Sequence, residues 1–190
     1  MNLRGNKLGD EGWCAIFDAL RDSPHNKIAK WDLHGEGVGL TVVKTLAAYM
    51  AVSASLTECR LGFNSLGDEG AESIATALKE STTSKLQTLN MNWNVISPKG
   101  ATALASYMAV SASLTSCDVR WNSISGDGAS ELSAAVLANA KLEVFNEIPI
   151  KEMRADTLTK LDLLGKTIGP EGGMVLAGLL PVSASLTSLE

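Results

Sequence analysis

A repeated segment is the feature that most limits what this chain can fold into. The segment Ala51–Thr57 recurs unchanged as Ala109–Thr115, and it recurs once more, without its first residue, as Val182–Thr187. Self-similarity of this kind predicts an array in which each unit buries its apolar face only against its neighbours. When the first apolar residue of each unit is taken as its start, the units begin near residues 28, 56, 86, 114, 142, 158 and 186.

Each unit combines a strand-like and a helix-like pattern. The clearest copy, residues 86–96, is Leu-Gln-Thr-Leu-Asn-Met-Asn-Trp-Asn-Val-Ile, where alternating apolar residues predict a short strand with one buried face. In the preceding unit, residues 67–70 (Gly-Asp-Glu-Gly) place acidic side chains where a helix would begin. An apolar stripe at helical spacing follows, made of Ala71, Ile74, Ala75 and Leu78.

This pattern resembles the leucine-rich repeat, L-x-x-L-x-L-x-x-N-x-L, in the long variant of ribonuclease inhibitor, NOD-like receptor arrays and the Ran GTPase-activating protein. The resemblance covers nearly the whole chain and implies one α/β solenoid over residues 1–190, with parallel strands on the concave face and helices on the convex face. Strands lie ~4.8 Å apart whereas helices are ~10 Å wide, so stacked units must curve. Both ends fall within a unit and lack a polar cap, which predicts a fragment of a longer array.

Asparagines recur at the turn that follows each strand. We expect their amides to satisfy unpaired backbone groups and to stack as a ladder of Asn6, Asn64, Asn94 and Asn122. Glu36, Ile150 and Lys166 replace this asparagine in three other units, where we expect a less regular turn. The unit over residues 142–157 is also too short for a full convex helix, and it predicts a local kink.

The outward side chains of the strands form the candidate binding surface. Three successive units place an aromatic residue where the strand ends, and the rings should stack into a ridge of Phe63, Trp93 and Trp121 about 10 Å long. Tryptophan and arginine are enriched in binding hot spots. We therefore expect partner contacts from this ridge and from His34, Arg60, Asn92, Asp118 and Arg120. The alternative is that the rings only pack over the loop edge and close the turn.

No catalytic, metal or cofactor site is predicted. Residues 35–39 (Gly-Glu-Gly-Val-Gly) lack the spacing of a dinucleotide-binding loop, and Gly165-Lys166-Thr167 lacks the earlier glycine of a phosphate-binding loop. The cysteines show no ligand spacing. Cys59 and Cys117 take inward positions two units apart, about 10 Å from each other, and are expected in the core without a disulfide bond.

Composition limits the partners. The net charge of −5 gives no basic footprint for nucleic acid and weakly favours a basic partner. No apolar stretch reaches the ~18–20 residues needed for membrane insertion. An odd, sparse set of three cysteines is typical of reduced thiols and favours a cytoplasmic location.

Together these features predict a non-enzymatic scaffold that binds another protein on its concave face. Two other functions stay open. The resemblance also implies GTPase activation toward a small Ran-like GTPase, as in the Ran-activating relatives. A structural array within a cytoskeletal or ciliary assembly is the third hypothesis, and it would use the convex or terminal surfaces instead of the ridge.

Overall fold

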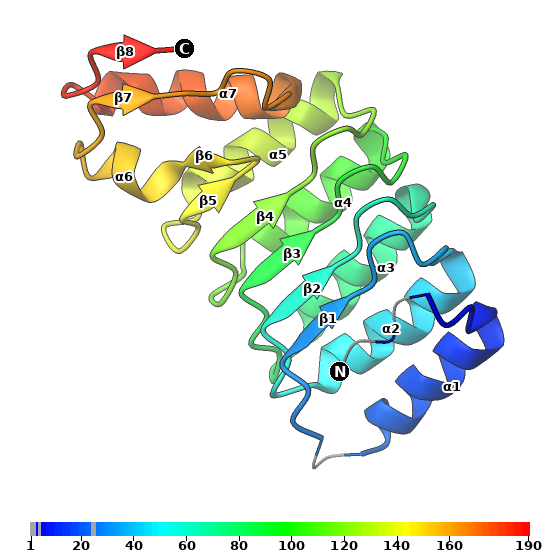
Figure 1. The fold of residues 1–190 in the computed structure, drawn as a ribbon. Helices are drawn as coiled ribbons and strands as arrows, with labels where there is room; N and C mark the ends of the chain where they lie inside the picture. The colour runs from blue at the N-terminus through cyan, green and yellow to red at the C-terminus, as the bar shows by residue number, and fades with distance from the viewer. Residues whose placement is uncertain (1–2, 4, 24–25) are drawn as a thin grey trace.

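The computed structural model describes residues 3, 5–23 and 26–190 as a stack of strand–helix units, with the strands on one side and the helices on the other (Figure 1). A strand begins two residues after every predicted unit start. These strands are β1 (Lys30–Asp32), β2 (Glu58–Arg60), β3 (Thr88–Asn90), β4 (Ser116–Asp118), β5 (Val144–Phe145), β7 (Lys160–Leu161) and β8 (Ser188–Leu189). The structure therefore confirms the repeat as the unit of the fold.

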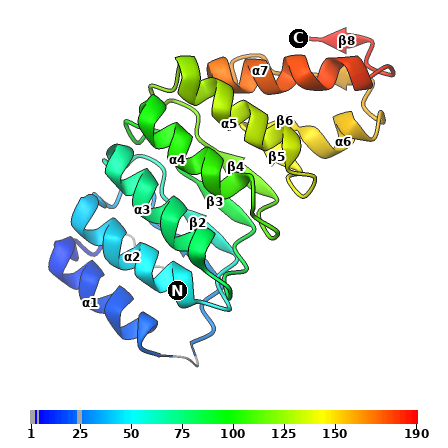
Figure 2. The same cartoon turned by 180° about the vertical axis from the view of Figure 1, so that it is seen from behind.

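The helices lie side by side behind the strands (Figure 2). They are α1 (Gly9–Arg21), α2 (Leu40–Val52), α3 (Gly67–Glu80), α4 (Pro98–Met108), α5 (Gly126–Ala138), the short α6 (Ile150–Arg154) and α7 (Gly169–Leu179), which runs into a 3-10 turn over Leu180–Val182. The stripe predicted in α3 is buried along its whole length. The predicted α/β solenoid is thus confirmed.

The core runs between the strands and the helices. Trp31, Cys59, Leu89 and Cys117 lie next to one another in register on β1 to β4, and all four are buried. All three cysteines of the chain are free, as expected. Burial raises the pKa of Cys59 to about 12 and raises the pKa of Cys117 as well, so both thiols stay protonated at neutral pH.

Aromatic side chains fill the N-terminal end of this core. Phe17 stacks against Trp13 at 5.8 Å and against Tyr49 at 6.2 Å between ring centroids. Trp31 meets Phe17 edge-on at 5.3 Å. The cluster joins α1 and α2 to the first strand, and large rings provide much of the apolar area that holds this end together.

The turn asparagines connect neighbouring units. The Nδ2 group of Asn94 donates to the carbonyl of Leu61 in the preceding unit at 2.8 Å and to the carbonyl of Met91 in its own unit at 3.1 Å. Its backbone N–H in turn donates to Oδ1 of Asn122 at 2.9 Å. Nδ2 of Asn64 makes the equivalent two bonds one unit earlier, to the carbonyls of Leu33 and Leu61, and its Oδ1 accepts from the backbone N–H of Val38. Asn6 donates to the carbonyl of Leu3 at 2.8 Å.

The unit over residues 142–157 interrupts the sheet. Its second strand, β6 (Ile148–Pro149), folds back antiparallel on β5, and the six-stranded sheet ends there. β7 and β8 form a separate parallel pair, so the ladder of parallel strands breaks in the short unit, where a local kink was expected. The reason is the two-residue turn of Asn146 (φ 49°) and Glu147 (φ 65°), whose left-handed backbone suits a tight hairpin.

Asn146, and not the residue at the repeat position, acts as the polar group of this unit. Ile150 stands where the repeat expects asparagine, but it is buried at the start of α6. Oδ1 of Asn146 instead accepts a hydrogen bond from the backbone N–H of Val119 at 2.9 Å. In the regular units that N–H donates to a backbone carbonyl of the next strand, as Met91 does to Asp118. A side chain therefore extends the pairing where the strand ends.

Asn94→Ala should lower the free energy of unfolding by about 1–3 kcal/mol, because it leaves buried carbonyls at the turn without a donor. Urea denaturation followed by circular dichroism measures this change. Asn90→Ala is the matched control, since Asn90 lies on the concave surface of β3, and its loss should lower the free energy of unfolding by less. Equal costs for the two variants would contradict the role of the buried amide.

Candidate functional site

The concave face carries a hollow of about 550 Å³ across β1 to β5. The structure brings five of the predicted contact residues to its lining, namely His34, Arg60, Asn92, Asp118 and Arg120. Most of the lining is polar, and several carboxylates are paired within the chain. Glu147, for example, contacts Arg120 at 2.6 Å and Lys166 at 2.7 Å. The hollow is therefore suited to orienting a protein surface more than to enclosing a small apolar molecule.

The aromatic ridge, made of Phe63, Trp93 and Trp121, flanks this hollow. The ring centroids of Phe63 and Trp93 lie 5.0 Å apart, and those of Trp93 and Trp121 lie 5.7 Å apart, with nearly parallel planes in both pairs. The imidazole of His34 lies 4.8 Å from the ring centroid of Phe63, with its plane tilted by 50°. Phe63 is 50% exposed and Trp93 is 44% exposed, so the ridge faces solvent along its outer side.

The three ridge residues share an unusual backbone conformation. Their φ angles are 56° at Phe63, 54° at Trp93 and 55° at Trp121. The equivalent residues in two other units are Gly35 (φ 69°) and Gly165 (φ 68°). A left-handed backbone costs a non-glycine residue roughly 1–2 kcal/mol. The turn thus has the geometry that glycine satisfies best, and large aromatic side chains are held there in its place.

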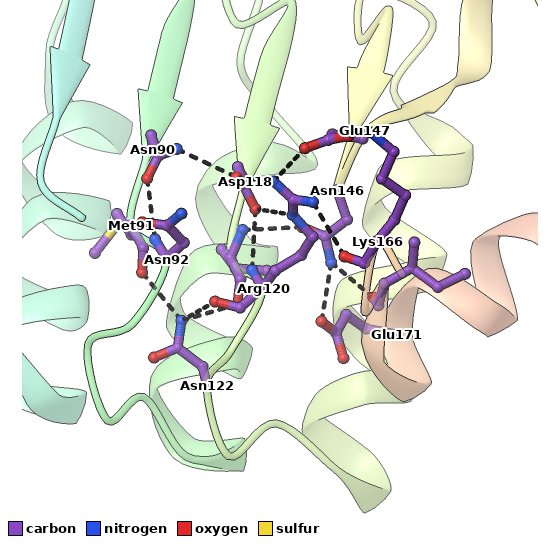
Figure 3. A network of polar contacts seen from close by, with 12 residues as sticks. Asn90, Met91, Asn92, Asp118, Arg120, Asn122, Asn146, Glu147, Lys166 and Glu171 are labelled. Atoms are coloured by element: carbon purple, nitrogen blue, oxygen red, sulfur yellow. Dashed lines mark hydrogen bonds and ion pairs between the residues drawn. The ribbon is translucent and has the colours of Figure 1, made fainter. Parts of the chain in front are cut away.

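Arg120 packs against Trp121, the last ring of the ridge, and its side chain is buried. The structure buries it to 6% exposure, whereas we expected a side chain facing a partner. Its guanidinium donates to Asp118 at 2.9 Å, to Glu147 at 2.6 Å and to the carbonyl of Lys166 at 3.0 Å (Figure 3). The same group lies 4.5 Å from the ring centroid of Trp121. Arg120 therefore fixes the last ring of the ridge.

Polar side chains also join the two sheets. Glu147 pairs with Lys166 at 2.7 Å. This hydrogen bond and the charge of Arg120 lower the pKa of Glu147 below its usual range, although partial burial opposes the shift. Nδ2 of Asn146 donates to the carbonyl of Ile168 at 2.9 Å and to Glu171 at 3.0 Å (Figure 3). Glu171 is 2% exposed, and this burial raises its pKa.

This junction between the two sheets was not predicted from the sequence. Asn146 and Glu147 lie between the apolar residues Phe145 and Ile148, and asparagine is favoured in the two-residue turns of hairpins. That signal was available. The burial of Glu171 had no such signal, because an acidic residue near a helix start is ordinarily exposed.

Gly62 makes room for the amide of Asn92. A Cβ atom at Gly62 would lie 2.1 Å from Oδ1 of Asn92 and 2.8 Å from Nδ1 of His34. Only glycine therefore fits at this position beside the hollow. Oδ1 of Asn92 is buried without a hydrogen-bond partner among the described residues.

Two other kinds of feature are absent from the described part of the chain. Within residues 3, 5–23 and 26–190, no group of three or more His, Cys, Asp or Glu side chains could hold a metal ion. In the same part of the chain, no helix has the length and apolar character required to cross a membrane.

Comparison with known proteins agrees with this architecture. The model of a family described as Leucine Rich repeat matches residues 52–75, 84–105 and 110–133. RAN GTPase-activating protein 2 of Arabidopsis thaliana is 37% identical over 98 residues, which are 52% of this chain and 18% of that protein. This chain is a leucine-rich repeat protein of the ribonuclease-inhibitor type.

A second relative extends the comparison to a sensor protein. The human NACHT, LRR and PYD domains-containing protein 5 is 34% identical to this leucine-rich repeat protein over 79 residues, which are 42% of the chain and 6% of that relative. The chain therefore spans less than a fifth of the length of either relative.

Two solved structures share the fold. The structure titled Leiomodin-1 Actin-Binding Site 2 superposes with a TM-score of 0.64 at 15% identity, covering 89% of this leucine-rich repeat chain and 87% of its own. The tropomodulin C-terminal domain of Caenorhabditis elegans gives a TM-score of 0.61 at 15% identity, covering 70% and 80%. At this level of identity the likeness concerns the fold alone.

The free energy of unfolding of Trp93→Gly should be about 1 kcal/mol higher than that of Trp93→Ala, because glycine accepts the left-handed backbone without strain. Denaturant titration of both variants measures the difference. At Thr102, exposed in α4, the order should reverse, since alanine is the better helix former. A Trp93→Ala variant as stable as Trp93→Gly would show that the turn carries no such strain.

Glu171→Gln should stabilise the chain at pH 7, because it removes a buried negative charge. Since burial raises the folded pKa of Glu171 above its unfolded value, the wild-type chain loses stability as the pH rises through these values. The advantage of the variant should shrink in acid, where Glu171 is protonated in both states. Thermal unfolding at pH 4 and pH 7 tests this, and a difference that does not change with pH would contradict it.

Proposed function

We propose that this leucine-rich repeat protein is a non-catalytic recognition scaffold that binds another protein on its concave strand face, with the aromatic ridge as the anchor. The leucine-rich repeat array itself indicates a protein-interaction scaffold. The concave position of the binding surface is the more specific part of the proposal.

One observation carries it: the rings of Phe63 and Trp93 stand about half exposed in turns where other units have glycine. If closing the turn were the only requirement, Gly35 and Gly165 show that glycine would meet it. Exposed aromatic rings in fixed positions are the side chains that most often dominate binding energy. The ridge also adjoins the polar hollow through His34 and Arg120. A central apolar anchor beside polar groups is the usual anatomy of a protein interface.

The character of the partner follows from charge. Carboxylates of the hollow such as Asp118 and Glu147 are paired with arginine or lysine of the same chain. The local charges therefore fix the register in which a partner binds. The net charge of −5 weakly favours a basic partner through long-range attraction. A cytoplasmic location belongs to the same proposal and is consistent with three free cysteines.

GTPase activation is the second candidate, and the 37% identity with RAN GTPase-activating protein 2 favours it. That activity is named for the relative, and the matched segment is 18% of its length. A structural array in a cytoskeletal or ciliary assembly has the support of fold likeness alone, since the leiomodin structure is 15% identical.

Affinity capture from a cell extract tests the concave surface. The double variant Trp93→Gly/Trp121→Gly removes two rings and supplies the residue that the turn prefers, so it should remain folded. We expect it to lose a set of proteins that the wild-type chain retains. The matched control is Val52→Ser/Val110→Ser, which changes exposed apolar residues at the last position of α2 and two residues beyond α4. An identical set for wild type and ridge variant would contradict the proposal.

Multiple-turnover hydrolysis separates the second candidate from the first. Purified Ran is incubated with GTP in the presence and absence of the chain, and phosphate release is followed. A recognition scaffold leaves the rate unchanged. Acceleration proportional to the amount of chain would replace the scaffold proposal by GTPase activation.

A further inference from the structure

The stacking of the ridge leaves its ring faces covered. Trp93 has Phe63 on one side and Trp121 on the other. The imidazole of His34, 4.8 Å away and tilted by 50°, packs against the remaining side of Phe63. The guanidinium of Arg120 lies over Trp121, and its partners Glu147 and Lys166 belong to later units, so it covers the face turned away from Trp93. What the ridge offers to solvent is therefore the rims of the rings.

The rims have a definite chemistry. The edge of an aromatic ring carries partial positive charge, in contrast to its face. The indole N–H groups of Trp93 and Trp121 are donors only, and neither has a hydrogen-bond partner among the described residues. Val95, 70% exposed, follows Trp93 in the same turn and adds apolar area. The side chains of the ridge thus form an apolar surface that has hydrogen-bond donors and no acceptor.

We propose that the aromatic ridge binds a proline-rich segment of a partner in the polyproline II conformation. This inference rests on the proposed function and specifies what the anchor recognises. Proline has a carbonyl acceptor and no backbone N–H, so a proline-rich chain offers acceptors only, which complements a surface that offers donors only. Its carbonyls make no internal hydrogen bonds and are free to accept from the two indoles.

Other ligands fit the ridge less well. A cation, a nucleobase or an aromatic side chain binds through a ring face, and those faces are covered. An α-helix uses its carbonyls internally, and an ordinary extended strand would turn unpaired N–H groups toward the positive rims. One turn of a polyproline II helix rises about 9.3 Å, which is close to the length of the three-ring stack. Such a segment is also preformed, so little entropy is lost on binding.

The four indole N–H signals of the chain make a direct test. A decaproline peptide is titrated into ¹⁵N-labelled protein while these signals are followed by NMR, with Trp→Phe variants for assignment. We expect the signals of Trp93 and Trp121 to shift and those of the buried Trp13 and Trp31 to stay fixed. A Gly-Ser peptide of equal length should move none of them. No shift at millimolar decaproline, or equal shifts with the Gly-Ser peptide, would overturn the inference.

The donors are tested separately from the rings. Trp93→Phe and Trp121→Phe keep a stacking ring but remove the N–H, and each should weaken decaproline binding about threefold to tenfold. The fixed signals of Trp13 and Trp31 report that each variant is folded. Unchanged affinity in both variants would overturn the donor–acceptor argument. Indole shifts that depend on protein concentration without peptide would instead assign the ridge to a second copy of the chain.

Affinity capture and the decaproline titration together separate failure of the proposed function from failure of the proline-rich ligand. If ridge-glycine variants lose captured proteins but decaproline does not bind, the recognition surface stands and its proline-rich ligand is excluded. If the captured set is unchanged and decaproline does not bind, both proposals fail.

Discussion

A buried amide at the end of the strand is the interaction on which the rest of the array depends. The amide of Asn94 bonds to carbonyls of its own unit and of the preceding one, and Asn64 repeats the arrangement. Each unit thereby fixes the turn of its neighbour at a place where backbone groups have no other partner. Because the turn is fixed, the residue before this asparagine takes the same left-handed conformation each time. The aromatic ridge is a consequence of that repetition.

The same constraint explains how the array changes direction. In the unit where Ile150 replaces the asparagine, the chain makes a hairpin, and Asn146 completes the pairing of β4 with a side chain. The backbone ladder stops, and side chains of Arg120, Glu147 and Asn146 reach the next sheet instead. Arg120 belongs both to this junction and to the support of Trp121. The last ring of the ridge is therefore held by the irregular unit.

Much of the fold could be predicted from the sequence because the repeat encodes it locally. The apolar spacing fixed every unit start, and Cys59 and Leu89 lie in the core where their position in the unit predicted them. The positions of the ridge residues followed from the same register. What could not be predicted depends on contacts between distant units. Arg120 was predicted to be an exposed contact because it takes an outward position of the repeat. It is buried because its carboxylate partner Glu147 comes from the hairpin, which the repeat does not describe.

The central claim is that a partner covers the outer rims of the ridge, and hydroxyl-radical footprinting tests it most directly. The oxidation of each tryptophan is measured by mass spectrometry with and without a purified captured partner. The account predicts that Trp93 and Trp121 become protected while Trp13 and Trp31, already buried, remain unreactive in both states. Oxidation of Trp93 and Trp121 that is the same in the bound and free protein would contradict it.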